Sequence, residues 1–341
     1  MISQGHLQVY DLCIKTYSPT FIGGGSDADY MKKEYYFDEA TNKVVFLHQE
    51  KFLSYIINNN LVDSYESYIL SNSSTYLKDF LDKHNIYRED IKDLITMETD
   101  AKHALSPGKS LSQIFGFVSD KYHRPYIPGS SIKGAFLTAI LYLKIKEYRI
   151  SAHDKNIEQK YRDIWAYAKN LLKGISFSDS EPINQKDMIL TRKDDLLPNG
   201  KVGNPNVVRQ CIKPNVQIKL KLTIDTKAAK MDVDYIRRAI TEFSSFYKST
   251  YLAPYKNYIH PIVIDNFISL GGGSGYHGKN IVYPMLGKEE AVKVVSEILD
   301  KRFKKHKSDV LYGMSPRCLK CTKLANSIKY HHMGICEVNI K

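Results

Sequence analysis

A clean alternation of apolar and polar residues at Val216–Ile224 constrains the fold of this chain more than any other local pattern. Every second position carries an aliphatic side chain, and the positions between them carry polar residues, including two lysines. A period of two residues is that of an extended strand with one buried face. The alternation therefore predicts a β-strand that packs one face on a core and presents a lysine-bearing face on the other side.

The order of the other predicted elements decides the fold class. Helical spacing of apolar residues alternates with short strand patterns, and no repeat of short fixed period is present. This mixed order favours an α+β fold with antiparallel sheets over a doubly wound parallel sheet, and a ferredoxin-like (RRM-like) split βαβ unit in each half is the simplest arrangement. Strands are expected at 6–16, 35–37, 44–47 and 262–270, and helices at 52–70, 75–84, 132–147, 157–173, 233–247 and 288–305.

Polar segments set the expected boundaries between these elements. Residues 97–112 are polar and predict a loop, and residues 184–206 mix charges with Pro and Gly and predict a mobile loop. The chain is accordingly divided into an N-terminal half, 1–180, with a helical insertion, and a C-terminal half, 206–341.

Charge and aromatic content point to a polyanionic partner. The chain has 49 Lys+Arg against 37 Asp+Glu, a net charge of +12, and it contains 25 Tyr. The segment from residue 301 to residue 330 contains nine basic residues and one acidic residue, Asp309. Such blocks attract phosphates, and tyrosine rings stack on unpaired bases, although tyrosines also fill protein cores. Charge and tyrosine content therefore suggest nucleic acid without deciding it.

The apolar stretches and the cysteines bear on the expected location of the protein. The longest apolar stretches fall well short of the ~20 residues that a membrane span needs, and the first residues do not resemble a secretory signal. Five cysteines in 341 residues are sparse and odd in number, which suits a reducing compartment. A cytoplasmic protein without a membrane partner is expected.

The segment Tyr126–Ala135 contains the most specific motif, Ile-Pro-Gly-Ser-Ser-Ile-Lys-Gly. Gly129 permits a sharp turn, Ser130 or Ser131 can cap the following helix, and Lys133 lies in its first turn. Free N–H groups at a helix start together with a lysine suit a phosphodiester. An ordinary strand-to-helix junction is the alternative interpretation.

A second glycine-rich segment, Gly271–Lys279, partly matches a phosphate-binding P-loop. Gly273 to Lys279 has the G-x-x-x-x-G-K spacing, but Asn280 stands where Mg²⁺ binding needs Ser or Thr, and Pro284 interrupts the expected helix. Nucleotide hydrolysis is therefore disfavoured. The loop is expected to approach an RNA phosphate or a neighbouring protein, and a flexible hairpin tip is the plain alternative.

Evidence for metal binding or catalysis is weak. Cys318 and Cys321, with His331, His332 and Cys336 behind them, match no common zinc motif, so chance pairing is favoured over a zinc site. No recognised catalytic motif is present, and no cofactor or metal is expected. Single side chains that could act as a general base are His6, His103, His123 and His277, and those that could bind a metal are Asp27, Asp29 and Asp179.

Taken together, these motifs resemble the RAMP superfamily of CRISPR proteins over nearly the whole chain. The resemblance rests on the first strand, the glycine turn Gly23–Gly25, the Tyr126–Ala135 segment, Phe177-Ser-Asp-Ser180 and the glycine loop at 271–275. Within that superfamily the chain is most similar to the large subunit at the head of the type III-A Csm effector complex. Cys318 and Cys321 depart from what the family leads us to expect.

The resemblance implies a non-catalytic subunit that binds the guide RNA (crRNA) toward its 3′ end, caps the filament of backbone subunits and is needed for guide maturation in antiviral defence. The implied partners are crRNA, the backbone RAMP subunit and the small helical subunit, with host nucleases as further candidates. Residues expected along the RNA or the adjoining subunit are Gly23, Gly24, Gly25, Gly129, Ser130, Ser131, Lys133, Gly271, Gly272, Gly273, Ser274, Gly275, Tyr276, Lys279 and Arg317. A metal-independent endoribonuclease with a base such as His123, and a nucleotide-hydrolysing switch, are the alternative hypotheses.

Overall fold

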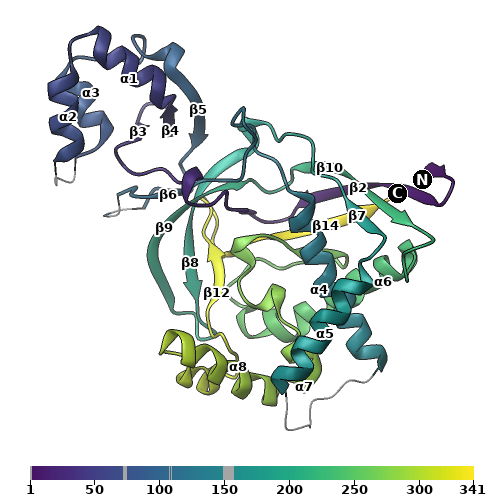
Figure 1. The fold of residues 1–341 in the computed structure, drawn as a ribbon. Helices are drawn as coiled ribbons and strands as arrows, with labels where there is room; N and C mark the ends of the chain where they lie inside the picture. The colour runs from purple at the N-terminus through teal and green to yellow at the C-terminus, as the bar shows by residue number, and fades with distance from the viewer. Residues whose placement is uncertain (1, 72–74, 107, 109, 149–156) are drawn as a thin grey trace.

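Two curled β-sheets and a set of helices make up the computed structural model, which describes residues 2–71, 75–106, 108, 110–148 and 157–341 (Figure 1). The α+β fold class that the sequence predicted is confirmed, since most neighbouring strands run antiparallel. The strands of the first sheet lie in the order β11-β14-β2-β10-β7, with β1 beside β2.

The centre of the first sheet is β2 (Leu7–Thr16), which pairs with β10 (Gln217–Asp225) on one side and with β14 (Ile335–Ile340) on the other. Leu12 and Leu220 lie opposite each other in this register, and both are buried. The predicted strands at 6–16 and 216–224 are therefore confirmed, whereas the one at 262–270 shrinks to three residues. The remaining strands are β1 (Ile2–Gln4), β7 (Ile175–Phe177) and β11 (Phe267–Ser269).

The second sheet has the order β13-β12-β8-β5-β4-β3, and β9 pairs with the other edge of β8. The pairs β5–β8 and β6–β9 are parallel, and the others are antiparallel. The bounds are β3 (Tyr35–Asp38), β4 (Lys43–Leu47), β5 (Ile95–Asp100), β6 (Ile114–Phe115), β8 (Met188–Leu196), β9 (Val202–Ile212), β12 (Leu319–Thr322) and β13 (His331–His332).

The prediction of a loop at 184–206 is wrong, because β8 and the start of β9 occupy most of it. The Pro and Gly residues that suggested a loop belong in part to a tight turn, where the Gly200 N–H donates to the Leu197 carbonyl at 2.9 Å. The charged residues belong to β8, where Asp195 forms ion pairs with Lys193 and Lys320. The loop predicted at 97–112 likewise begins with the last residues of β5, and Pro107 and Lys109 within it lie outside the described residues.

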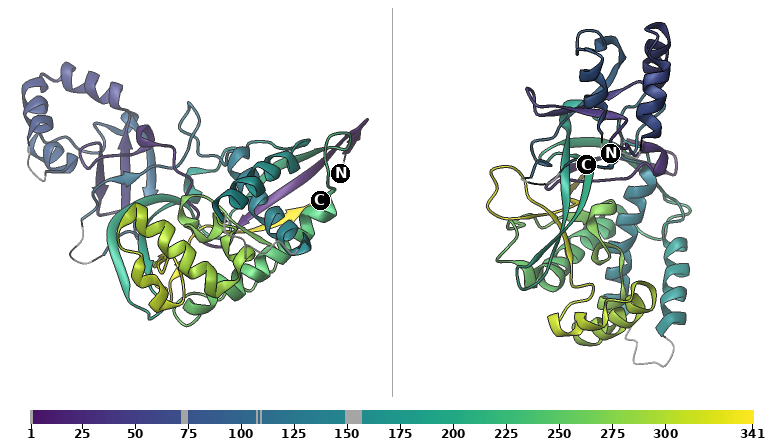
Figure 2. Two further views of the ribbon diagram at one scale, coloured as in Figure 1. Left: turned by 60° about the horizontal axis from the view of Figure 1, so that its bottom comes forward. Right: turned by 90° about the vertical axis from the view of Figure 1, so that its left-hand side faces the viewer.

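The helices divide into two groups. The larger group is built around α4 and α6, which lie against the first sheet, and the smaller group forms a lobe at the far end of the second sheet (Figures 1 and 2). The first group comprises α4 (Gly129–Tyr148), α5 (Ile157–Leu171), α6 (Val233–Phe246), α7 (Val282–Leu286) and α8 (Lys288–Phe303). Their apolar faces and the first sheet share one core, in which Phe136, Ile236 and Phe267 are fully buried.

The lobe consists of α1 (Gln49–Asn58), α2 (Val62–Leu70) and α3 (Leu77–Lys83). Phe52, Ile56 and Phe80 pack on one face of β3 and β4 and form a core of their own. The single helix predicted at 52–70 is two helices, because the chain turns at Asn60, whose φ is +59°.

Both sheets combine strands from the two predicted halves of the chain. In the first sheet, β2 pairs with β10 and β14, and in the second, β6 pairs with β9, with Ile114 opposite Val208. The main core accordingly includes residues from Tyr10 to Ile340. The division at 180–206 is therefore not a division between sheets.

Candidate RNA interface

The two glycine segments meet at Phe21, although about 250 positions separate them in the chain. The Gly272 N–H donates to the Phe21 carbonyl at 2.9 Å, and Gly271 lies so close to that carbonyl that a Cβ there would overlap it. Gly271 has φ +80° and ψ −170°, a backbone conformation available almost only to glycine. The residues after Phe21 lead directly into Gly23–Gly25, so the two loops form one continuous surface.

The glycines of the first loop are exposed and are held by the neighbouring chain. Gly23 forms an isolated β-bridge with Phe117, and the Gly24 N–H donates to the Gly116 carbonyl at 3.2 Å. Gly25 has φ +92°, a value that favours glycine. The amides of Gly24 and Gly272 are thus already used within the protein, and contact of these glycines with RNA stays a prediction.

The second loop is partly buried and does not form a P-loop. Short 3-10 helices cover Gly272–Ser274 and His277–Lys279; Gly273 and Ser274 are buried, Gly275 and Tyr276 are half-buried, and Lys279 is exposed. No regular helix follows Lys279 directly: α7 starts at Val282, whose N–H donates to the Asn280 side-chain oxygen. Pro284 lies in the first turn of α7, where its missing N–H costs no hydrogen bond. This geometry agrees with the weak P-loop match.

The helix start at Gly129 is occupied by the protein itself. The Gly129 N–H donates to the Asp179 carboxylate at 2.8 Å, and the Lys133 ammonium donates to the Ile175 carbonyl at 3.1 Å. Gly129 is buried against the Phe177 carbonyl, Ser131 is half-buried and Ser130 is exposed. The anionic group at this helix start is therefore Asp179 of the protein itself, and RNA contact there stays a prediction.

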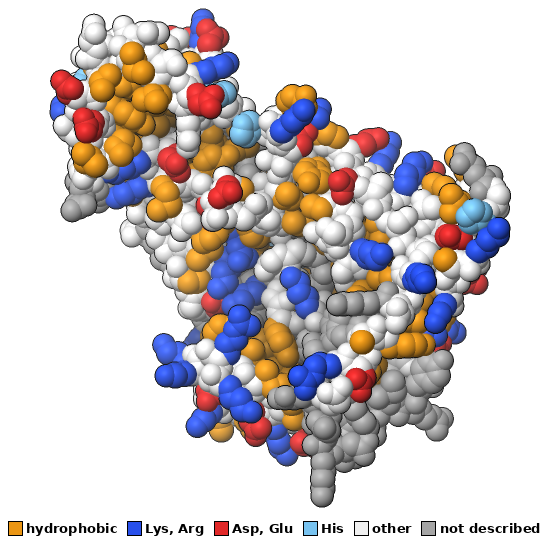
Figure 3. Space-filling view, in the orientation of Figure 1, with side chains coloured by type: hydrophobic (Ala, Val, Ile, Leu, Met, Phe, Trp, Pro, Cys, Tyr) orange, Lys and Arg blue, Asp and Glu red, His pale blue; other side chains and the backbone are white. Residues whose placement is uncertain are grey.

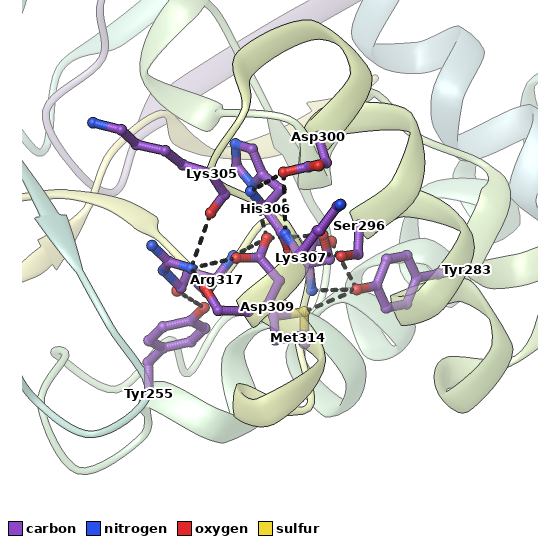
Figure 4. Close-up of polar contacts among 12 residues, drawn as sticks. Tyr255, Tyr283, Ser296, Asp300, Lys305, His306, Lys307, Asp309, Met314 and Arg317 are labelled. Atoms are coloured by element: carbon purple, nitrogen blue, oxygen red, sulfur yellow. Dashed lines mark hydrogen bonds and ion pairs between the residues drawn. The ribbon is translucent and has the colours of Figure 1, made fainter.

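Arg317 is likewise committed to a partner inside the protein. Its Nη1 atom donates to the Asp309 carboxylate at 3.0 Å and to the Lys305 carbonyl at 3.2 Å (Figure 4). Asp309 is completely buried. Arg317 thus anchors the segment after α8, and an RNA contact by Arg317 stays a prediction.

Three basic side chains of the second sheet lie near the glycine loops. Lys193 on β8 and Lys320 on β12 both bind Asp195, at 2.8 and 2.5 Å, so this group of three keeps one excess positive charge. The Lys320 side chain lies beside Gly275. Arg209 on β9 stacks over the Phe21 ring, with Cζ 4.9 Å from the ring centroid. The sequence analysis did not identify Lys193 and Arg209 as site residues. It predicted a loop at 184–206, and the pairing of β8 with β9 and β12 that places both side chains near the glycine loops was therefore not foreseen.

The basic block after residue 300 is mainly a surface feature. Five of its side chains are exposed at the end of α8 and just beyond it: Lys301, Arg302, Lys304, Lys305 and Lys307. Figure 3 shows Lys and Arg side chains gathered over the part of this face where β8, β12 and α8 lie.

A cavity of about 800 Å³ opens on the other side of the first glycine loop, between that loop and the lobe. Gly24 and Met97 belong to its lining, and its acidic side chains outnumber its basic one, Lys121. The acidic side chains are Asp27, Asp29, Glu34, Glu50 and Asp120. Like charges repel, so this cavity disfavours a phosphodiester.

A model of the RAMP superfamily matches residues 13–276, most of the chain. The chain belongs to the RAMP superfamily. The resemblance inferred from the glycine loops and the Tyr126–Ala135 segment is thereby confirmed at the level of the family.

Curated relatives of this RAMP chain match it over 80% of its length or more. It is 21% identical over 379 residues to the CRISPR system Cms protein Csm5 of Mycobacterium tuberculosis (strain CDC 1551 / Oshkosh), with 98% of each chain covered. It is 24% identical over 290 residues to the protein of the same name from Streptococcus thermophilus, with 80% of each covered.

Solved structures share the RAMP fold. A chain in the cryo-EM structure of a Csm–crRNA–target RNA ternary complex of a type III-A CRISPR-Cas system matches with a TM-score of 0.66 at 18% identity, covering 97% of this chain and 100% of that one. The crystal structure of T. onnurineus Csm5 matches with a TM-score of 0.57 at 17% identity, covering 95% and 99%. At this identity the likeness concerns the fold.

The candidate histidines of the RAMP chain have different surroundings. His6 and His123 are exposed, whereas His277 is buried below the second glycine loop against the Tyr251 ring. Burial lowers the pKa of His277 to about 3 and also lowers that of His103. His277 is thus neutral at physiological pH and belongs to the core.

The cysteines and carboxylates were also candidates for a metal site. Cys321 and Cys336 are buried, and burial raises the pKa of both thiols. No cluster of three or more His, Cys, Asp or Glu side chains suited to a metal ion is found among the described residues. In the same part of the chain, no helix is long and apolar enough to cross a bilayer.

Buried histidines predict an acid-sensitive fold. Burial lowers the pKa of His277 to about 3 and that of His331 and His332 to about 4, whereas the unfolded value is about 6.5. Below pH 6.5 these histidines bind protons in the unfolded chain but not in the native chain. The unfolding free energy therefore decreases as the pH is lowered. Between pH 6.5 and 5.5, each histidine is expected to cost about 1 kcal/mol of unfolding free energy.

Urea denaturation at the two pH values measures this loss. His331 is the least buried of the three, so His331→Gln is the matched variant and should remove about one third of the loss. An unfolding free energy that stays constant between pH 6.5 and 5.5 would contradict the prediction.

Proposed function

We propose that this chain is a crRNA-binding subunit of a type III-A Csm ribonucleoprotein, located at the 3′ end of the guide, where it caps the backbone filament and supports guide maturation. The observation that carries the proposal is the meeting of two glycine loops at Phe21, beside basic side chains of β8, β9 and β12, in a chain of net charge +12. The names of the curated relatives and the complex containing the similar chain support the same assignment.

The chemistry of this surface suits a guide better than a sequence-specific RNA. A guide must keep its bases free to pair with a target, so its carrier holds the sugar–phosphate backbone. Exposed glycines let that backbone approach closely, and lysine and arginine neutralise its phosphates without reading sequence. The proposed partners are accordingly crRNA and the adjoining subunits, chiefly the backbone RAMP subunit and the small helical subunit, working in the cytoplasm.

A carboxylate placed on this surface should weaken RNA retention. Gly272 is exposed, and a Cβ there would make only an ordinary contact, 3.4 Å from Phe21 Cδ1. Gly272→Asp adds a negative charge where phosphates are expected, and it should lower guide affinity of the reconstituted complex about tenfold at 0.1 M salt. Filter binding over a salt series measures this effect, which should shrink as the salt concentration rises.

Gly272→Ala is the matched control, since it adds the same Cβ without the charge. Equal guide retention by the two variants at every salt concentration would remove the glycine loops from the proposed interface. The proposal that the subunit is non-catalytic is tested separately by incubating the purified chain with precursor RNA in EDTA, where a discrete cleavage product would refute it.

A further inference from the structure

Arg209 lies at the point where the two glycine loops meet. Its guanidinium stacks over the Phe21 ring at 4.9 Å. The edge of the same ring borders both loops, because a Cβ on Gly23 would lie 3.2 Å from Phe21 Cζ and one on Gly272 would lie 3.4 Å from Cδ1. Phe21 thus holds the guanidinium next to the exposed glycine backbone of both loops.

Among the residues that the structure describes, none of opposite charge forms an ion pair with the guanidinium of Arg209. Its Nε and Nη1 atoms are shielded from solvent and make no hydrogen bond in the described part of the chain. Burial lowers its pKa, which reflects the cost of holding the charge there. Asp195 is the carboxylate whose charge reaches it, but Lys193 and Lys320 already neutralise that group.

Arg317, which is half-buried like Arg209, has a carboxylate partner, because it binds Asp309. A shielded cation without an anion is unfavourable in a folded protein. Its presence beside an open, glycine-lined surface therefore indicates an anion that comes from outside the chain.

We propose that Arg209 is the anchor for one phosphodiester of an RNA strand that crosses the junction of the glycine loops. Phosphate oxygens are the acceptors that a guanidinium binds in pairs. The excess positive charge of Lys193 and Lys320 around Asp195 favours the same anion, and the exposed glycines leave room for it. This inference rests on the proposed RNA-binding function and names the charged residue of that interface.

Arg209→Met tests the anchor, because methionine keeps an unbranched side chain and removes the charge. In the complex reconstituted with guide RNA, affinity at 0.1 M salt should fall about tenfold, and the slope of log K against log[salt] should shrink by about 0.7–0.9, the loss of one phosphate contact. Arg209→Lys should keep the slope and lose part of the affinity. Arg238→Met, at an exposed arginine of α6 that binds Glu147, is the control and should change neither quantity.

Thermal unfolding of the RNA-free chain separates this role from a structural one. Arg209→Met should leave the melting temperature unchanged or raise it, since the deleted charge has no carboxylate partner among the described residues and the methionine side chain can still pack on the Phe21 ring. A lower melting temperature would assign Arg209 to the fold and overturn the proposal. If the Arg209→Met complex has the wild-type affinity for guide RNA and the wild-type salt slope, Arg209 is not a phosphate anchor, although the chain still binds RNA. If the wild-type complex retains no RNA, the proposed function itself is refuted.

A neighbouring subunit could also supply the anion, as a carboxylate. In that case Arg209→Met would weaken assembly of the complex in the absence of RNA. Unimpaired assembly without RNA, together with weakened RNA retention, is the result that the phosphodiester predicts.

Discussion

Replacing Gly271 with alanine is expected to destabilise the protein by about 2–6 kcal/mol. The backbone at Gly271, with φ +80° and ψ −170°, costs a residue with a side chain about 1–3 kcal/mol. The new Cβ would also overlap the Phe21 carbonyl, and such overpacking costs about 1–3 kcal/mol more. Relief of the overlap would separate the two glycine loops, so RNA retention should fall together with stability.

Gly272→Ala provides the comparison for this variant. It changes the neighbouring position in the same loop, but its Cβ would make ordinary contacts with the Phe21 ring. It should alter the unfolding free energy by less than about 1 kcal/mol. Denaturant unfolding of both variants measures the difference, and equal midpoints would show that the close approach at Phe21 does not constrain the fold.

Asp309→Ala should cost about 3–5 kcal/mol, because it leaves a mostly buried cation without its partner. The Asp309 carboxylate is completely buried and accepts hydrogen bonds from Ser315 Oγ at 2.9 Å and from Arg317 Nη1 at 3.0 Å (Figure 4). His306 Nδ1 lies 2.8 Å from the same carboxylate. This network joins the end of α8 to the chain that enters β12, so its loss should loosen the basic block as well.

Two further variants test whether the loss of stability comes from the buried Asp309–Arg317 ion pair. Asp234→Ala removes an exposed partner of Arg237 and should cost less than about 1 kcal/mol. The double variant Asp309→Leu with Arg317→Met removes both charges and should be more stable than Asp309→Leu alone. Additive losses in denaturant unfolding would show that the two groups do not depend on each other.

Much of the secondary structure was predictable because it follows from local periodicity. The alternation at 216–224 gave β10, and the helical spacing after Gly129 and Val233 gave α4 and α6. The hairpin of β8 and β9 was missed, because Lys193, Asp194 and Asp195 look like a solvated loop until their partners are known. Pro205 lies where the register between the two strands shifts, a position at which a strand tolerates proline.

The candidate interface was predictable in its parts and not in its arrangement. Both glycine loops were identified from sequence, but nothing local showed that Gly272 binds Phe21 or that Arg209 stacks on the same ring. Conversely, Lys133 and Arg317 looked available for phosphates, and the fold gives each a partner inside the protein.

The role of the tyrosines also depended on the tertiary structure. The sequence left them open between base stacking and the core, and the structure buries Tyr35, Tyr247, Tyr251, Tyr255 and Tyr283 completely. Sequence alone determined the fold class, most helices, the strands β2, β3, β4, β10 and part of β11, the positions of the glycine loops and the excess of positive charge, because each depends on composition or on neighbours a few residues away. Only the tertiary structure decided which charges are neutralised and which remain available, because the partner of a charged group can lie hundreds of positions away along the chain.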